Sequence, residues 1–335
     1  MQYKSVKGYS ALAQFGILCL FLLVGFILAA IVQLGISMQM LPKGASILDA
    51  EAITKAMMLP QNVNLARLAQ VAGTFFLLCI PAILYSWVTN GRNLFLLGFN
   101  KHIHIYQVLL GFAIIYAANI MAAPIADLSK DVVANFPNLN ALAKKLEAAY
   151  NEQVLALSNL RSWPEFLMAV VIMAFFPALL EELFFRGALQ NILVRWIGNA
   201  FVAILITSII FSLIHMSVYL FVSRIILGFV LGLMYHKTKN IWVNVIAHFL
   251  NNAIAVGQLF WLSNQNKKID VSMLDPKIEW WLGLLAAVAL VGLFWLLQKI
   301  SRNKQAVIAA EEKRLYALNN TSDPFHNNND LLGAK

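Results

Sequence analysis

The chain is 335 residues long, 60% of its residues are hydrophobic and only 12% are charged. A soluble domain carries about 25% charged residues, so the composition excludes a soluble globular protein. The net charge of +9 is also found in nucleic-acid-binding proteins. Here, however, the excess Lys and Arg residues flank apolar segments, where they can contact anionic lipid headgroups. We therefore expect a lipid bilayer as partner, and no nucleic acid.

The apolar residues occur in blocks of roughly 20, the length of an α-helix that crosses a hydrocarbon core. This pattern predicts an all-α, polytopic helical membrane protein with about eight transmembrane helices and a buried polar active-site cavity. In chain order, the expected spans are Ala11–Gly35, Leu68–Thr89, Tyr106–Ile125, Trp163–Trp196, Ala200–Met216, Val218–His236, Ile241–Leu262 and Trp280–Lys299.

The basic residues predict the orientation of these spans. Lys and Arg are concentrated in the short flanks that would lie on the same side as the N-terminus, and cytoplasmic flanks are the ones enriched in Lys and Arg. We therefore expect an integral, multi-pass protein of the bacterial cytoplasmic (inner) membrane, with both termini in the cytoplasm. The residues on that side are Lys4, Lys7, Arg92, Lys101, Arg195, Lys237, Lys239, Lys299, Arg302 and Lys304.

The pattern divides the chain into five regions. Within the second of them, leucines and a tyrosine recur at helical spacing over Leu139–Leu157, which predicts an amphipathic helix on the outer surface. The expected regions are a cytoplasmic flank (1–10), three spans plus the amphipathic helix (11–162), a four-span catalytic core (163–262), the last span with its preceding loop (263–299), and a cytoplasmic, partly disordered tail (300–335).

The fourth expected span contains charged residues at membrane depth, in the stretch "PALLEELFFRGALQ" (Pro177–Gln190). Each charge at the centre of a span costs roughly 2.5–3.5 kcal/mol, so such residues persist where they pair or face a cavity. Glu182 and Arg186 are four residues apart on one helix face and can form an ion pair. Glu181 is rotated by about 100° from Glu182 and remains available for another role. Pro177 can kink this helix one turn earlier.

Further polar residues lie in the later spans: His215 in the fifth, and His248 with Asn252 in the seventh. Glu181 lies 17 positions before Gly198, and His215 lies 17 positions after it. If the chain turns at Gly198, the equal rise along the two helices of the hairpin brings these two side chains to the same depth in the membrane. His248 and Asn252 are again four residues apart on one face. We expect all four side chains to converge in one buried polar pocket.

This set of residue types suits the hydrolysis of an acyl bond without a serine or cysteine nucleophile. A carboxylate and an imidazole can together act as general base on a water molecule, while a second imidazole and an amide can donate hydrogen bonds to an oxyanion. Alternatively, Glu181, His215 and His248 could bind zinc. Because the spacing HExxH is absent, we expect that the site works without a cofactor, and zinc is the alternative.

Three segments, "EELFFR", "FSLIH" and "HFLNN", resemble the motifs EExxxR, FxxxH and HxxxN of the CPBP family. This group of intramembrane endopeptidases includes type II CAAX prenyl proteases, bacteriocin-processing enzymes and Abi-like proteins. The resemblance covers about Trp163 to Leu262 and implies proteolysis of a membrane-associated or lipid-anchored protein or peptide.

The resemblance also implies a role for each motif residue. The water-activating pair would be Glu181 and His215, and the oxyanion donors would be His248 and Asn252. The supporting residues would be Glu182, Arg186 and Phe211, of which the first two brace the site and the last packs beside it.

Simpler structural roles are expected for several polar and small residues. Taken alone, Glu182 and Arg186 suit a structural ion pair. Arg224 is expected to reach the membrane surface or to pair locally, with a position at the site as the alternative. Gly228 and Gly232 form a GxxxG pattern, which favours close helix contact.

Two further functions remain open from the sequence. The chain could be a non-proteolytic membrane scaffold or immunity factor of the same fold, although such a protein does not need all four polar side chains. It could also be a proton-coupled transporter that uses Glu181, although the paired broken helices typical of many transporters are absent from the sequence pattern.

Overall fold

The computed structural model describes residues 4–42, 44, 46, 49–157, 160, 162–264 and 277–321. Within these ranges the regular secondary structure is helical, apart from an isolated β-bridge between Lys4 and Ser10. The expected all-α class is therefore confirmed. The α-helices are α1 (Ala11–Met40), α2 (Ala50–Met57), α3 (Val63–Thr74), α4 (Ile80–Asn90), α5 (Ile105–Ala134), α6 (Pro137–Leu157), α7 (Trp163–Ala169), α8 (Phe176–Glu182), α9 (Asn191–Ile197), α10 (Ala200–Ile214), α11 (Phe221–Thr238), α12 (Ile241–Ser263) and α13 (Trp280–Thr321).

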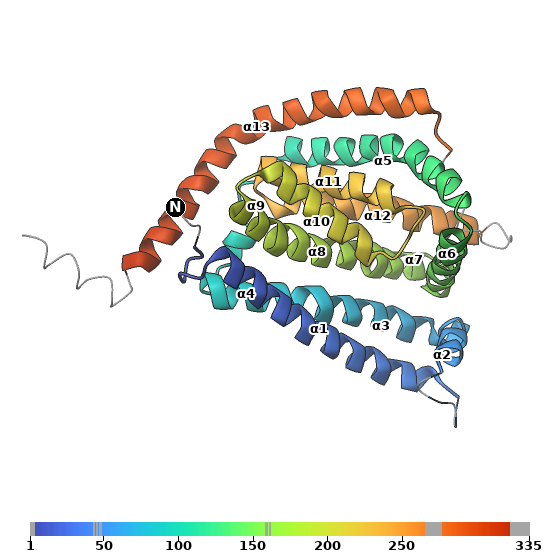
Figure 1. Ribbon diagram of the computed structural model, residues 1–335. Helices are drawn as coiled ribbons and strands as arrows, with labels where there is room; N and C mark the ends of the chain where they lie inside the picture. The colour runs from blue at the N-terminus through green and yellow to red at the C-terminus, as the bar shows by residue number, and fades with distance from the viewer. Residues whose placement is uncertain are drawn as a thin grey trace, which may run out of the picture.

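The long helices form a bundle in which α1, α3 and α4 lie on one side and α5 and α13 on the other (Figure 1). Helices α8 to α12 fill the space between these two groups. Among the helix pairs in contact, α5 packs against α11, α12 and α13, and α10 packs against α11. The central helices carry the residues that the sequence singles out, so the candidate site is enclosed on both sides.

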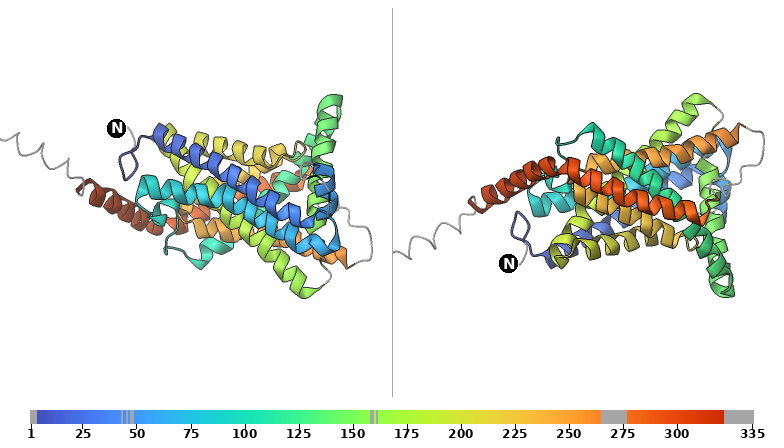
Figure 2. Two further views of the ribbon diagram at one scale, coloured as in Figure 1. Left: turned by 90° about the horizontal axis from the view of Figure 1, so that it is seen from below. Right: turned by 90° about the horizontal axis from the view of Figure 1, so that it is seen from above.

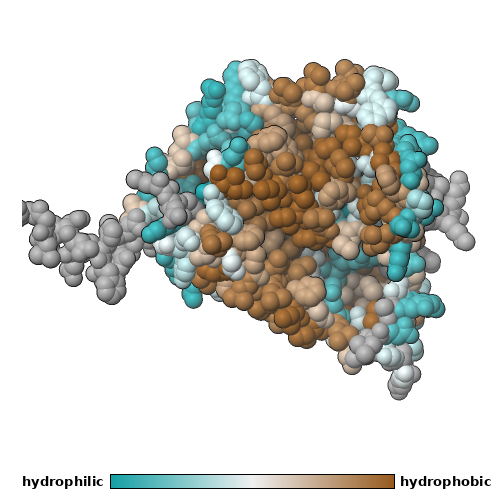
Figure 3. Space-filling view, in the orientation of Figure 1, coloured by the Kyte–Doolittle hydropathy of each residue, from teal (hydrophilic) through white to brown (hydrophobic). Residues whose placement is uncertain are grey.

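The outer surface of the bundle is apolar over its middle. In Figure 3 hydrophobic residues cover the centre of the face shown, and hydrophilic residues gather toward its two ends. Large side chains such as Leu23, Val291 and Trp295 are exposed. An apolar band of this kind, with backbone groups satisfied inside helices, is what a hydrocarbon environment requires.

Six helical stretches of the described chain are long and apolar enough to cross a membrane. These stretches coincide with six of the eight expected spans. The other two expected spans correspond to α10 and α11, which are shorter, at 15 and 18 residues. The multi-pass class is therefore confirmed, while the count of eight stays a prediction. The six stretches are Ala11–Met40, Pro60–Asn90, Ile105–Ala134, Trp163–Ile197, Ile241–Ser263 and Trp280–Ala317.

Two helices differ in direction or length from the rest of the bundle. The expected amphipathic helix is α6, and it runs across one end of the bundle rather than along it (Figure 2). Helix α13 continues unbroken to Thr321, so the last expected span and the start of the expected tail form one helix. Of the polar end at 319–335, where we expected disorder, residues 322–335 lie outside the described residues.

Helices α10 and α11 approach closely at the two glycines of the GxxxG pattern. A Cβ atom on Gly232 would lie 2.6 Å from Cγ2 of Ile204 and 2.8 Å from Oε1 of Gln190. The close approach also allows a hydrogen bond across the contact, because the Gly232 carbonyl accepts from Gln190 at 2.9 Å. The sequence-based expectation of close helix contact is confirmed, and the contact fixes α11 beside the candidate site.

Candidate active site

A helical hairpin brings Glu181 and His215 together. The helical stretch Trp163–Ile197 ends at Gly198, which has a left-handed φ of 73°. Glycine adopts this conformation at little cost, and Asn199 then caps α10 by accepting hydrogen bonds from two backbone N–H groups. As expected from their equal distances to this turn, Glu181 and His215 line the same cavity.

The helix that carries Glu181 is not a regular α-helix. Two π-helical segments interrupt it: Val170–Phe175 lies just before α8, and Leu183–Gln190 follows it directly. Pro177 sits in the first turn of α8, where its missing N–H removes one intrahelical hydrogen bond. The expected irregularity at Pro177 therefore takes the form of a π-helical segment. Such segments occur frequently at functional sites.

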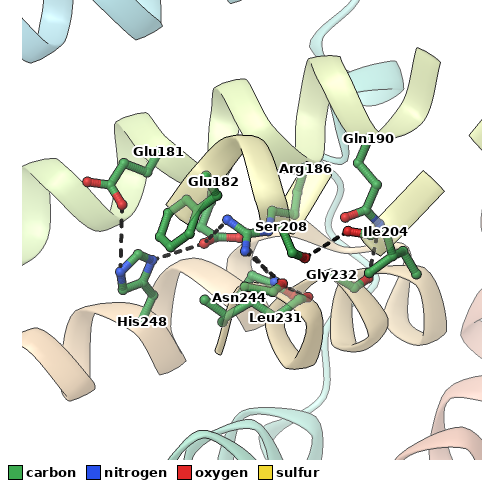
Figure 4. A network of polar contacts seen from close by, with 12 residues as sticks. Glu181, Glu182, Arg186, Gln190, Ile204, Ser208, Leu231, Gly232, Asn244 and His248 are labelled. Carbon is green, nitrogen blue, oxygen red and sulfur yellow. Dashed lines mark hydrogen bonds and ion pairs between the residues drawn. The ribbon is translucent and has the colours of Figure 1, made fainter. Parts of the chain in front are cut away.

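Glu182 is the centre of a buried polar network (Figure 4). Its side chain is fully buried, and its Oε1 accepts a 2.9 Å hydrogen bond from Nη1 of Arg186. Its Oε2 accepts a 3.1 Å hydrogen bond from Asn244 of α12. Arg186 also donates to the Gly228 carbonyl at 3.1 Å. The expected pair of Glu182 with Arg186 is present, and each partner is held by a second helix.

His248 lies between the two glutamates. Its Nδ1 is 2.9 Å from Oε1 of Glu182, and its Nε2 is 3.8 Å from Oε2 of Glu181. Because Glu182 already accepts from Arg186, it is an ionised acceptor, so Nδ1 of His248 carries a proton and donates. Figure 4 shows the ring bridging α8 and α12 in this way. Glu182 therefore orients His248 in addition to pairing with Arg186, a contact that the sequence analysis missed.

His215 ends α10, and its ring orientation is fixed by the backbone. Nδ1 lies 2.8 Å from the Phe211 carbonyl, which can only accept. A neutral ring therefore donates through Nδ1 and carries a lone pair on Nε2, which suits a general base. The Phe211 ring packs 4.5 Å from the His215 ring and lies 5.1 Å from the Arg186 guanidinium. Phe211 thus packs beside the site, as its motif position implied.

The four candidate catalytic side chains line one cavity of about 320 Å³, as expected from the sequence. Glu181 contributes a buried Oε2 that has no hydrogen-bond partner among the described residues. Asn252 sits one turn beyond His248 on α12, beside Asn251, whose Oδ1 accepts a 2.6 Å hydrogen bond from Asn119. The geometry therefore gathers a carboxylate, two imidazoles and an amide around a single space.

Two residues of the site were not assigned to it from sequence. Asn244 lies four residues before His248, so continuation of the same helix face was the available signal. Arg224 was expected to reach the membrane surface or pair locally. It does pair locally, through a 3.2 Å hydrogen bond to the His215 carbonyl, but it also lines the cavity.

A second cavity adjoins the first, and a third adjoins the second. The second, of about 460 Å³, shares Glu181, His215 and Tyr150 with the first and extends toward α3 and α6. The third, of about 600 Å³, has mainly apolar walls from α5, α6, α10 and α11. This third cavity shares Leu146 and Met216 with the second. The apolar third cavity is therefore connected to Glu181 and His215 through the second cavity.

A structural zinc site needs several ligating side chains gathered around one point. In the described ranges, no group of three or more His, Cys, Asp or Glu side chains is arranged to hold a metal ion. Glu181, His215 and His248 line one cavity, but they do not form a three-ligand cluster.

The fold and the cavity define a multi-pass integral membrane protein with a carboxylate–imidazole site inside its helical bundle. More particularly, residues 163–254 match the family model described as Type II CAAX prenyl endopeptidase Rce1-like, so this segment is similar to the domains of that family. The match includes all four candidate catalytic residues. It confirms the resemblance to CAAX-type proteases that the three sequence motifs indicated.

Two curated proteins of Bacillus subtilis (strain 168) are similar over the same part of the chain. "Putative membrane peptidase YdiL" is 30% identical over 89 residues, which is 27% of this chain and 36% of that protein. "Uncharacterized protein YpbD" is 32% identical over 103 residues, which is 30% of this chain and 48% of that protein. The chain thus spans about a third to a half of the length of these relatives. No solved structure matches the chain.

Proposed function

We propose that this protein is an intramembrane endopeptidase that hydrolyses a peptide bond in a membrane-associated or lipid-anchored protein or peptide. The observation that carries the proposal is the convergence of Glu181, His215, His248 and Asn252 on one cavity inside the bundle. The similarity to the Rce1-like family and the relative named as a membrane peptidase support the same class of reaction.

In the proposed mechanism, Glu181 and His215 share one water molecule and remove a proton from it. The water oxygen then bonds to the scissile carbonyl carbon, and the carbonyl oxygen becomes an oxyanion. The abstracted proton passes to the amide nitrogen as the C–N bond breaks, which releases a carboxylic acid and an amine. The lone pair on Nε2 of His215 suits this role because Nδ1 is engaged by the Phe211 carbonyl.

The oxyanion is stabilised by His248 and Asn252. For Nε2 of His248 to donate, the ring must be an imidazolium, because its Nδ1 proton already points at Glu182. Two carboxylates lie beside the ring, since Glu182 lies 2.9 Å from one ring nitrogen and Glu181 lies 3.8 Å from the other. Preorganised donors in a space with little water contribute most to this type of catalysis.

The adjoining cavities support a substrate with both a polar backbone and an apolar part. The 600 Å³ cavity has apolar walls and lies next to the second cavity through Leu146 and Met216. An apolar side chain or a lipid chain could be buried there at a gain of about 0.8 kcal/mol per CH₂ group. We propose a lipid-anchored or membrane-embedded segment as substrate, cleaved at the membrane.

The test is a comparison of membrane-protein fragments from cells with the wild-type protein, the Glu181→Gln variant and the Glu51→Gln variant. Glu51 is an exposed residue of α2 and serves as the matched carboxylate control. Fragments that depend on the protease should disappear in Glu181→Gln and persist in Glu51→Gln. An unchanged fragment pattern at equal protein abundance would refute proteolysis and favour a scaffold or transport function.

A further inference from the structure

Arg224 is a half-buried cation that faces the cavity of the candidate site. Its Nη1 donates a 3.2 Å hydrogen bond to the His215 carbonyl, and its guanidinium lies 5.5 Å from the centre of the Tyr150 ring. No carboxylate of the described residues pairs with it. Arg186, by contrast, is matched by the carboxylate of Glu182. Arg224 is therefore a cation in a polar cavity whose charge no described residue balances by direct contact.

The contacts of Arg224 leave most of its donors available. A guanidinium carries five N–H donors in one plane, and the hydrogen bond to the His215 carbonyl uses Nη1. The guanidinium carbon lies over the Tyr150 ring of α6, a contact that uses the positive charge and not the N–H hydrogen bonds. The remaining N–H donors of a guanidinium match the two oxygens of a carboxylate, with which they form paired hydrogen bonds.

We propose that Arg224 is a specificity-determining residue that binds a carboxylate group of the substrate. This inference rests on the proposed peptidase function. Since Arg224 bonds to the carbonyl of His215 itself, the bound carboxylate would lie close to the scissile bond. In a peptide, this group is either the free C-terminal carboxylate or the side chain of Asp or Glu.

The positions of the two cavities indicate how the substrate is oriented. The Arg224 cavity measures about 320 Å³, a size at the lower end of ligand pockets, so it holds a short piece of chain. Glu181 and His215 also line the second cavity, which extends toward α3 and α6. The carboxylate end would therefore occupy the cavity at Arg224, and the remainder of the substrate would extend into the second cavity. This arrangement favours the C-terminal carboxylate over an internal acidic side chain.

The test uses full-length protein in lipid nanodiscs and short fluorescent peptides of mixed sequence. Each peptide is made as a free C-terminal acid and as the matching C-terminal amide. Mass spectrometry records the cleavage positions and the kcat/KM values. The variants are Arg224→Gln, Arg224→Lys and Glu181→Gln, with Arg302→Gln as the charge control because Arg302 is an exposed residue of α13.

The wild type and Arg302→Gln should cleave the acids about 10- to 100-fold faster than the amides, the range expected for a hydrogen-bonded charge. Arg224→Gln should abolish this preference. Arg224→Lys should keep part of it, because an ammonium keeps the positive charge but lacks the planar pair of N–H donors of a guanidinium. If amides are instead cut beside Asp or Glu, and Arg224→Gln removes that enrichment, the carboxylate is a side chain. Equal acid-to-amide ratios in wild type and Arg224→Gln, with no enrichment for acidic residues, would overturn the proposal.

A failure of the peptidase function itself would look different, since wild type and Glu181→Gln would then both leave every peptide intact. Fluorescence anisotropy of the same peptides with Glu181→Gln and with Glu181→Gln/Arg224→Gln then decides the role of Arg224. Tighter binding of acids that disappears in the double variant supports the carboxylate site. Equal binding of acids and amides to both proteins refutes it.

Discussion

Nδ1 of His248 lies 2.9 Å from Oε1 of Glu182, the same oxygen that accepts a hydrogen bond from Arg186. One buried carboxylate therefore neutralises a cation on its own helix and orients an imidazole on α12. The first contact stabilises the fold, and the second fixes which nitrogen of His248 faces Glu181 and the cavity. The two adjacent glutamates thus have separate tasks, because Glu181 takes no part in the pairing with Arg186.

This division predicts that substitution of Glu181 affects cleavage and substitution of Arg186 affects stability. Glu181→Gln should abolish cleavage with little loss of folded protein, because Glu181 makes no hydrogen bond through its buried Oε2. Arg186→Ala should lower the free energy of unfolding by about 3–5 kcal/mol, because it leaves Glu182 charged and buried without its cation. Thermal unfolding and the yield of monodisperse protein in detergent measure the difference. Equal losses of folded protein in both variants would contradict this assignment.

Asn252 should act on the transition state rather than on substrate binding. If its amide donates to the oxyanion, Asn252→Ala should lower kcat by about 10²–10³ with little change in KM. Steady-state kinetics on a cleavable peptide give both constants. A fall in kcat of less than about tenfold, or a change confined to KM, would assign Asn252 to packing or substrate binding instead.

The mechanism also predicts independence from a bound metal. Activity of the purified protein should survive treatment with a chelator, and elemental analysis should find zinc well below one atom per chain. An Asn side chain is a good amide donor, so the spacing of His248 and Asn252 fits an oxyanion site. One zinc per chain, with activity lost to chelator and restored by added zinc, would overturn this mechanism and recast Glu181, His215 and His248 as ligands.

Helix packing at the GxxxG pattern predicts a stability effect that is independent of catalysis. Gly232→Ala should lower the free energy of unfolding by about 1–3 kcal/mol, because the new methyl group overlaps Ile204 and Gln190. Gly292→Ala in α13 is the matched control, since no atom lies within 4 Å of the added Cβ there. Thermal unfolding in the same detergent compares the two. Equal stability of both variants would show that α10 and α11 separate easily.

Reporter fusions test the expected orientation. The N–H of Lys7 donates to the Thr89 carbonyl at 3.0 Å, and Arg195 pairs with Glu312 of α13. The N-terminal flank, the turn at Arg92 and the end of α13 therefore lie toward the same end of the bundle (Figure 1). An outside signal at Arg92 would refute the orientation. Fusions expected outside are at Gly44, Ser129 and Gln265, and those expected inside are at Arg92 and Lys335.

Periodicity within a helix predicted much of the site, whereas contacts between helices were harder to predict. The pair of Glu182 with Arg186 follows from spacing on one helix, and the common depth of Glu181 and His215 follows from counting residues to a turn. The contact between Glu182 and His248 depends on how α8 and α12 are rotated about their axes. The sequence pattern does not give that rotation.

The same limit explains Arg224 and Tyr150. A lone arginine near the start of an apolar helix is compatible with pairing, with reaching the membrane surface or with facing a cavity. What decides between them is α6, which crosses the end of the bundle and places Tyr150 over the guanidinium. The sequence predicted this helix and its amphipathic character, but not which cavity its tyrosine would line.

The π-helical segment Leu183–Gln190 has a consequence for how this site tolerates changes in chain length. A π-helical turn holds one residue more than an α-helical turn. Deleting a single residue between Arg186 and Asn191 would therefore allow an ordinary α-helix there, with the glutamates of α8 and the residues of α9 kept on their present faces. In a regular α-helix such as α13, one deleted residue instead rotates everything beyond it by about 100°. Single-residue deletions should therefore be tolerated better in this segment than in the middle of α13.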